Sequence, residues 1–224
     1  MDRARSLSRL SVDLLPWYAA LTALVSLLAA FLVVTAPEDA VQGIVQKIFY
    51  LHVPAAIAAY ACFGAVLVGG VVYLWKESAA FDRLARVSAE VGALFTTITL
   101  VMGSIWAKPI WGTYWVPWDA RLVSTLVLWL IYLAYILVRR VGGPGRQTAR
   151  FAAVVGIVGF IDVPVVHYSV QWFRTIHPPL VAAQPDSLPG QMLPAFVAGI
   201  CAVLLYAGLL VWLRYRLELR REAA

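Results

Sequence analysis

Six long apolar stretches run through this chain, and each is close to the ~20 residues that a helix needs to cross the hydrocarbon core of a membrane. Over the 224 residues, 62% are hydrophobic and only 13% are charged, whereas soluble domains carry about 25% charged residues. This composition excludes a water-soluble globule. The predicted spans cover residues 17–36, 48–75, 91–107, 122–138, 151–170 and 193–213.

The stretches predict an all-α integral membrane protein, a bundle of six transmembrane helices that forms a single polytopic domain over residues 1–224. The first stretch follows three arginines and runs for about 20 residues without a charge, which is longer than the apolar region of a cleaved signal peptide. We therefore expect it to remain as a membrane anchor. The chain has little room for an aqueous domain, and we expect no nucleotide-binding fold.

Lysine and arginine are distributed unequally between alternate segments. Fourteen of the 18 lie in the N-terminal tail, the second and fourth loops and the C-terminal tail. By the positive-inside rule, these segments and both termini are predicted to be cytoplasmic, so the basic excess indicates topology rather than nucleic-acid binding. The first, third and fifth loops then face outward and carry the remaining four cations, Lys47, Lys108, Arg121 and Arg174.

Two of the three histidines reach the outer face from distant parts of the sequence. His52 lies in KIFYLHVPAA at the outer end of the second span, and His177 lies in SVQWFRTIHPP in the last outer loop. Two imidazoles on one face could bind a metal from opposite sides, as haem iron requires. Alternatively, each is an ordinary polar residue near the interface. His167, at the end of the fifth span, is more typical of packing or of a supporting role.

The outer loop at about 106–121 is rich in tryptophan. An aromatic belt at the headgroup level would account for one or two of its rings, but not for four tryptophans in a single loop. Trp111, Trp115 and Trp118 are spaced at i, i+4 and i+7, so they would share one face if the loop turned helically. With Tyr114 between them, such a face predicts a flat platform against which a large planar conjugated ligand could stack.

Charged residues flank the proposed platform. Asp119 precedes the fourth span, where Asp is a preferred N-cap residue. Arg121 stands at the start of the same helix, where the macrodipole disfavours a cation, so it should find a partner in Asp119 or in an incoming anion. Lys47 lies five residues before His52, and Arg174 lies close to the second histidine. Both could reach the propionates of a haem, or they could extend to lipid headgroups instead.

Asp162 is an ionisable residue within the fifth span, two residues before Pro164. Such residues commonly face the interior of a helix bundle and have a polar partner. We expect Asp162 to help shape a kinked helix and place it outside the site.

Taken together, the stretches GSIWAKPIWGTYWVPWDARLVSTLVLWLIYLAY, YLHVPAA and PVVHYSVQWFRTIHPP closely resemble the haem exporter protein C family of cytochrome c maturation. This family belongs to the tryptophan-rich (WWD-domain) haem-handling superfamily. The resemblance covers roughly residues 40–215 in matching order. It implies six spans and a haem b held non-covalently at the periplasmic face of the bacterial inner membrane, between two histidines and the aromatic segment.

By motif, His52 and His177 match the axial histidines of the family. The tryptophan-rich signature and the basic positions beside it are matched by Trp111, Trp115, Trp118, Asp119, Lys47 and Arg121. The family commonly reads W-G-x-W-W-V-W-D, whereas this chain has Tyr114 in place of one tryptophan and Pro117 as an extra residue. This departure leaves open which ring contacts the porphyrin.

The resemblance implies a non-enzymatic relay subunit that presents haem to a membrane-anchored periplasmic haem chaperone for attachment to c-type cytochromes. Its implied partners also include ATP-binding-cassette transporter subunits and a very small single-span membrane protein. Two other functions stay open. A membrane b-type cytochrome would carry electrons, although the predicted cytoplasmic side holds no histidine. A transporter scaffold would use the tryptophans to dock a partner and would bind no haem.

Overall fold

The computed structural model describes residues 2–177, 190 and 192–223, and its named elements are all helical. Six segments are long and apolar enough to cross a membrane, which confirms the predicted fold class; the second and the fifth each combine two helical elements. The elements are α1 (Asp2–Thr35), the 3-10 helix η1 (Ile44–Ile48), α2 (Phe49–Lys76), α3 (Ala79–Trp111), α4 (Ala120–Val141), α5 (Arg146–Phe160), α6 (Asp162–Trp172) and α7 (Met192–Glu222).

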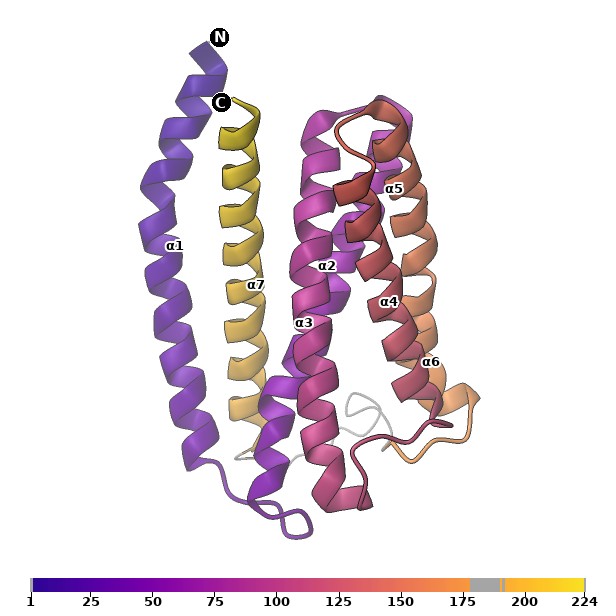
Figure 1. Ribbon diagram of the computed structural model, residues 1–224. Helices are drawn as coiled ribbons and strands as arrows, with labels where there is room; N and C mark the ends of the chain where they lie inside the picture. The colour runs from indigo at the N-terminus through magenta and orange to yellow at the C-terminus, as the bar shows by residue number, and fades with distance from the viewer. Residues whose placement is uncertain (1, 178–189, 191, 224) are drawn as a thin grey trace.

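The helices are arranged as an upright bundle with both ends of the chain at the same end (Figure 1). The connections between α1 and α2, between α3 and α4, and after α6 lie together at the opposite end. Helix α2 packs against α3, α5 and α7, while α1 packs against α7. This arrangement brings the first and third loops and the segment after α6 to one end of the bundle, as the topology prediction requires.

Helices α1 and α7 run past the predicted spans, since α1 begins at Asp2 instead of residue 17 and α7 ends at Glu222 instead of residue 213. Two further elements differ. Helix α3 begins at Ala79, well before the predicted start at residue 91, because its charged first turns extend beyond the apolar part of the span. The predicted fifth span is divided into α5 and α6 at Ile161, next to Asp162. Pro164 stands in the first turn of α6, where the hydrogen bond that proline cannot donate is not needed.

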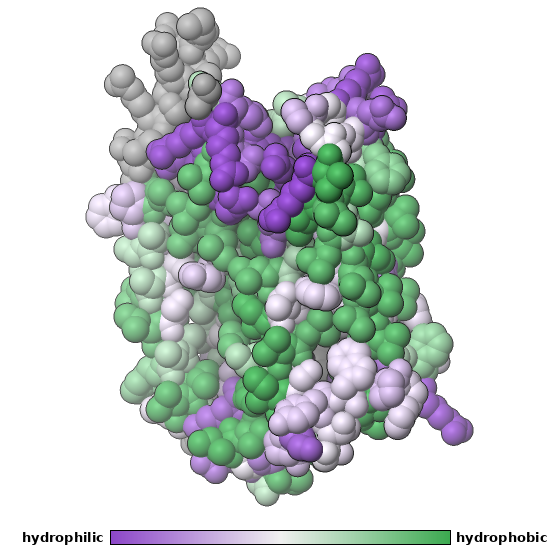
Figure 2. Space-filling model, in the orientation of Figure 1, coloured by the Kyte–Doolittle hydropathy of each residue, from purple (hydrophilic) through white to green (hydrophobic). Residues whose placement is uncertain are grey.

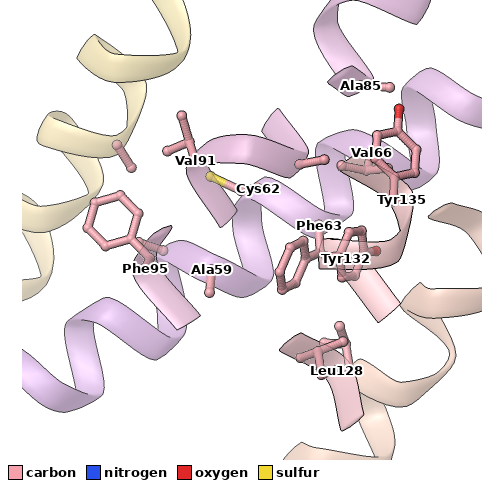
Figure 3. Close-up of a cluster of buried hydrophobic side chains, with 14 of the residues drawn as sticks. Ala59, Cys62, Phe63, Val66, Ala85, Val91, Phe95, Leu128, Tyr132 and Tyr135 are labelled. Carbon is pink, nitrogen blue, oxygen red and sulfur yellow. The ribbon is translucent and has the colours of Figure 1, made fainter. Parts of the chain in front are cut away.

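The packed core lies among α2, α3, α4 and α5 (Figure 3). The rings of Phe63 and Tyr132 stack with centroids 3.6 Å apart and planes 8° apart, and both side chains are fully buried. The Tyr132 hydroxyl donates a hydrogen bond of 3.1 Å to the carbonyl oxygen of Gly156. Close packing in this core holds the four helices together. The cavity described below lies nearer the end of the bundle opposite the termini.

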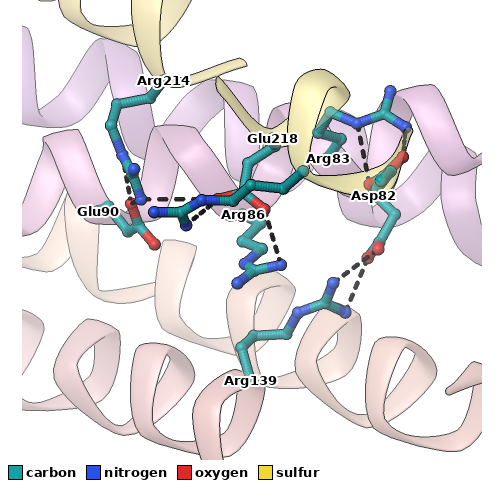
Figure 4. A network of polar contacts seen from close by, with 9 residues as sticks. Asp82, Arg83, Arg86, Glu90, Arg139, Arg214 and Glu218 are labelled. Carbon is teal, nitrogen blue, oxygen red and sulfur yellow. Dashed lines mark hydrogen bonds and ion pairs between the residues drawn. The ribbon is translucent and has the colours of Figure 1, made fainter. Parts of the chain in front are cut away.

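Ion pairs join the helices at the end that holds the termini (Figure 4). Arg86 lies 3.1 Å from Glu218, and Arg214 donates to Glu90 at 2.9 Å, so α3 and α7 are linked along their sides. Figure 2 shows hydrophilic surface gathered at this end above an apolar middle band. The basic residues that the positive-inside rule assigns to the cytoplasm therefore lie together, and the sidedness itself stays a prediction.

Candidate functional site

A cavity of about 630 Å³ lies at the end of the bundle opposite the termini. Its volume falls within the range of about 300–1,000 Å³ that is typical of small-molecule sites. Its wall is mostly apolar and combines residues of α2, α3, α4, α6 and α7 with the loop after α6. The predicted site residues that line it are His52, Trp111, Arg121 and His177, and they are joined there by His167.

His177 is oriented by a carboxylate. Its Nδ1 atom lies 3.0 Å from Oδ1 of Asp119. Burial lowers the pKa of the His177 imidazole below its usual value, although the Asp119 carboxylate acts in the opposite direction. A neutral imidazole that donates its Nδ1–H to Asp119 keeps a free lone pair on Nε2. This is the usual arrangement for a histidine that binds a metal, since the second nitrogen of such a ring is normally hydrogen-bonded to a carboxylate or carbonyl.

Asp119 is 1% exposed and joins two segments of the site. Its Oδ1 caps α4 by accepting from the backbone N–H groups of Arg121 and Leu122 at 3.1 Å each, which confirms the predicted N-cap. Its Oδ2 accepts from the Thr175 hydroxyl and from the Ile176 backbone N–H. Burial by itself would raise the pKa of Asp119, but these hydrogen bonds outweigh it and lower that pKa. The residue is therefore an ionised carboxylate that ties the start of α4 to the loop after α6.

His52 is held mainly by packing, with the backbone of Thr99 as its polar neighbour. Within the described part of the chain, its buried Nδ1 has no hydrogen-bond partner. A Cβ atom at Gly103 would lie 2.8 Å from Cε1 of the ring, so only glycine leaves room for the imidazole in this position. The edge of Trp106 packs against the same ring with centroids 5.9 Å apart, and Trp106 donates a hydrogen bond to Gln42.

The tryptophan-rich loop does not form the helical platform that the spacing predicted. Helix α3 continues through Trp111 and ends at Gly112, whose φ of 76° lies in the left-handed region that favours glycine. Residues 112–119 are not helical, so Trp111, Trp115 and Trp118 do not share one helical face. Trp111 packs edge-on against His177 with centroids 5.0 Å apart.

The other aromatic residues of the loop lie further out. Tyr114 is 58% exposed and Trp118 is 79% exposed, while Trp115 is partly buried. Their predicted contact with a planar ligand stays a prediction. Only a ligand that extends beyond the mouth of the cavity could contact these rings.

The four outer cations are placed differently. Arg121 lines the cavity, and its guanidinium donates to the carbonyl oxygen of His167 at 3.0 Å, a partner that was not predicted. Asp119 accepts from the backbone N–H of Arg121 and not from its guanidinium. Lys47 donates to the carbonyl oxygen of Val34 at 2.8 Å and so links η1 to the end of α1. Arg174 is exposed. Arg121 is therefore the cation best placed to meet an anionic group of a bound ligand.

Sequence reasoning did not assign Gly103, Trp106, Gln42 and Thr175 to the site. Gly103 and Trp106 are three residues apart on α3 and therefore lie on the same side of that helix, which was an available signal. However, this spacing indicates a site only once His52 is known to pack on that side of α3. Thr175 belongs to the site only because it contacts Asp119, a residue remote in sequence.

Comparison with known proteins shows the family of this chain. The family model for Heme exporter protein C matches residues 1–224, the whole chain. The chain belongs to the haem exporter protein C family. This membership confirms the resemblance drawn from the tryptophan-rich segment and the two histidine motifs.

Three relatives named Heme exporter protein C illustrate the similarity within the haem exporter protein C family. The Bradyrhizobium diazoefficiens protein is 38% identical over 204 residues, which are 89% of this chain and 77% of the relative. The Haemophilus influenzae protein is 36% identical over 194 residues, or 84% of this chain and 77% of the relative. The Escherichia coli K12 protein is 40% identical over 142 residues, or 63% of this chain and 58% of the relative.

Proposed function

We propose that this protein binds haem b non-covalently in the cavity and presents it to a membrane-anchored periplasmic chaperone for the biogenesis of c-type cytochromes. The observation that carries the proposal is that His52 and His177 line one cavity although they lie in distant parts of the sequence. Membership in the haem exporter protein C family supports haem as the ligand. In this proposal haem is cargo, and the protein is a relay subunit rather than an enzyme.

The residues present fit a haem. Haem iron accepts two imidazole nitrogens, the porphyrin requires apolar walls, and its propionates require a cation or hydrogen-bond donors. His177 offers a neutral ring oriented by Asp119, and the absence of a Cβ at Gly103 leaves room for the ring of His52. The apolar lining supplies the walls, and Arg121 supplies a positive charge within the cavity.

We place the site at the periplasmic face of the bacterial inner membrane. The basic ends of α3, α4 and α7 lie at the other end of the bundle, together with both termini, and cytoplasmic segments of membrane proteins are enriched in such residues. A periplasmic site would allow a soluble domain of the chaperone to reach the haem directly.

The exposed aromatic residues beside the cavity are proposed to receive the chaperone. Trp118 and Tyr114 project from the tryptophan-rich loop, and Trp172 and Phe173, at the end of α6, are 59% and 54% exposed. Aromatic residues are enriched at protein interfaces because they bury a large area for little loss of side-chain entropy. The remaining proposed partners are transporter subunits with an ATP-binding cassette and a very small single-span membrane protein.

The proposal is tested by the absorption spectrum and the haem-to-protein ratio of the full-length protein purified in detergent. We expect one haem per chain with a low-spin spectrum. His52→Ala and His177→Ala should each lose the haem or the low-spin spectrum. His167→Ala is the matched control, since His167 also lines the cavity but its ring packs against Tyr168, and it should leave the spectrum unchanged.

Two results would contradict the proposal. Unchanged spectra in both His52→Ala and His177→Ala would remove the ligand assignment. A colourless wild-type protein that still assembles with its transporter would favour the scaffold alternative.

A further inference from the structure

The two proposed ligands are held by different forces. Nδ1 of His177 is 3.0 Å from Asp119, and the backbone N–H of His177 donates to the Thr175 hydroxyl at 3.1 Å. Asp119 and Thr175 are in turn hydrogen-bonded to each other. The His177 ring is therefore fixed in direction by a closed set of polar contacts around a buried carboxylate.

His52 has no comparable support among the residues that the structure describes. Its Nδ1 is buried without a hydrogen-bond partner, and its ring is positioned by Gly103 and by the edge of Trp106. Packing of this kind excludes other positions of the ring, but it adds no negative charge behind the imidazole.

This difference changes the strength of the two rings as ligands. A carboxylate that accepts the Nδ1–H of an imidazole raises the basicity of Nε2 and fixes the ring, and loss of such a partner typically costs 10–100-fold in metal affinity. By this measure His177 is the stronger ligand. His52 is held by packing and has the neutral backbone of Thr99 beside it in place of a carboxylate.

We propose that His52 is the ligand that is released first when haem leaves, while His177 retains the haem, and that Gly103 is the positioning residue for His52. The inference rests on the proposed haem site. In the release step the bond from the His52 nitrogen to iron breaks, its electron pair stays on that nitrogen, and the iron keeps its oxidation state. The freed position can then accept a neutral lone-pair donor from the receiving protein.

The first test compares the rates at which ferric haem passes from the purified variants to excess apomyoglobin. We expect His177→Ala to lose haem at least about tenfold faster than His52→Ala, because the ring that remains in His177→Ala lacks the carboxylate. Equal rates, or faster loss from His52→Ala, would overturn the proposal.

Asp119→Asn provides a second arm of this experiment. Asparagine is as good an N-cap as aspartate, so α4 keeps its cap while the charge behind His177 is lost. The substitution should accelerate haem loss strongly in the His52→Ala background and only slightly in the His177→Ala background. Equal acceleration in both would show that Asp119 acts on the whole site and not through His177.

The second test addresses Gly103. In Gly103→Ala the new Cβ would lie 2.8 Å from the His52 ring, so the ring must move. We expect this variant to retain haem but to show the high-spin spectrum of His52→Ala. Gly92→Ala on the same helix is the matched control, since its Cβ would lie 2.5 Å from the Phe63 ring in the core. It should lower the melting temperature and leave the haem spectrum unchanged.

A milder control is Gly64→Ala, whose Cβ would meet Phe160 at an ordinary 3.8 Å and which should leave both the spectrum and the stability unchanged. A low-spin spectrum in Gly103→Ala would contradict the positioning role. The proposed function fails separately, if the wild type binds no haem or neither histidine affects its spectrum. If both histidines affect the spectrum but the order of the rates is reversed, the inference fails and the site stands.

Discussion

Oδ1 of Asp119 lies 3.0 Å from Nδ1 of His177, so the residue that caps α4 also orients the histidine of the loop after α6. One buried carboxylate thereby links the tryptophan-rich loop, a transmembrane helix and a proposed ligand. The tryptophan-rich segment is therefore tied to the site through its final aspartate as well as through its rings.

The double role of Asp119 predicts an ordered effect on stability. Asp119→Ala removes the cap and the anchor of the loop, whereas Asp119→Asn retains an acceptor for the cap. Loss of a cap costs about 0.5–2 kcal/mol. We expect the melting temperature in detergent to fall in the order wild type, Asn, Ala, as measured by circular dichroism. A variant Asp119→Ala as stable as Asp119→Asn would show that the cap contributes nothing.

Arg121 is predicted to retain haem through its charge. Arg121→Ala should lower the haem-to-protein ratio after purification, because it removes the cation that lines the cavity. Lys108→Ala is the control: Lys108 is exposed, donates to the carbonyl oxygen of Gly112, and should leave the ratio unchanged. Equal haem occupancy in Arg121→Ala and wild type would count against a role in binding the propionates.

The aromatic residues of the loop are predicted to differ in their contributions. Trp111→Ala should reduce haem occupancy more than Trp118→Ala, since Trp111 lines the cavity and contacts His177 while Trp118 is largely exposed. Haem content per chain, measured by pyridine haemochrome, checks the order. If the two substitutions reduced the content equally, the binding face would extend over the whole loop.

The ion pairs at the opposite end are predicted to act on stability and not on haem. Arg139 donates two hydrogen bonds to Asp82, at 3.0 and 2.7 Å, and both side chains are mostly buried. Arg139→Gln should destabilise the protein by about 1–3 kcal/mol, as expected for hydrogen bonds between charged groups. Arg146→Gln disrupts an exposed pair with Glu77 and should cost less than about 1 kcal/mol. Thermal unfolding gives the comparison, and a changed haem spectrum in Arg139→Gln would contradict the separation of the two ends.

The spans could be predicted from sequence because a membrane requires about 20 apolar residues per crossing, and this requirement is local. The start of α3 was missed for the same reason. Its first turns carry Arg83, Arg86 and Glu90, which look like a solvent-exposed loop until α7 supplies their partners. A hydropathy pattern does not predict ion pairs with residues of another helix.

The site was only partly predictable. The residue types of His52, His177 and Arg121 indicated their chemistry, and the alternation of loops indicated that they could meet. The helical spacing of the tryptophans was misleading because Gly112 adopts a left-handed conformation and ends the helix after Trp111. The pairing of Asp119 with His177 depends on how two distant segments fold together, which no local pattern records.

Two imidazoles that share one iron atom are the central feature of the proposed site, and electron paramagnetic resonance of the ferric, haem-loaded protein tests this feature directly. We predict a low-spin signal with two imidazole ligands in the wild type, which is replaced by a high-spin signal when either His52 or His177 alone is changed to alanine. A high-spin signal in the wild type, or a low-spin signal that persists unchanged in both variants, would contradict it.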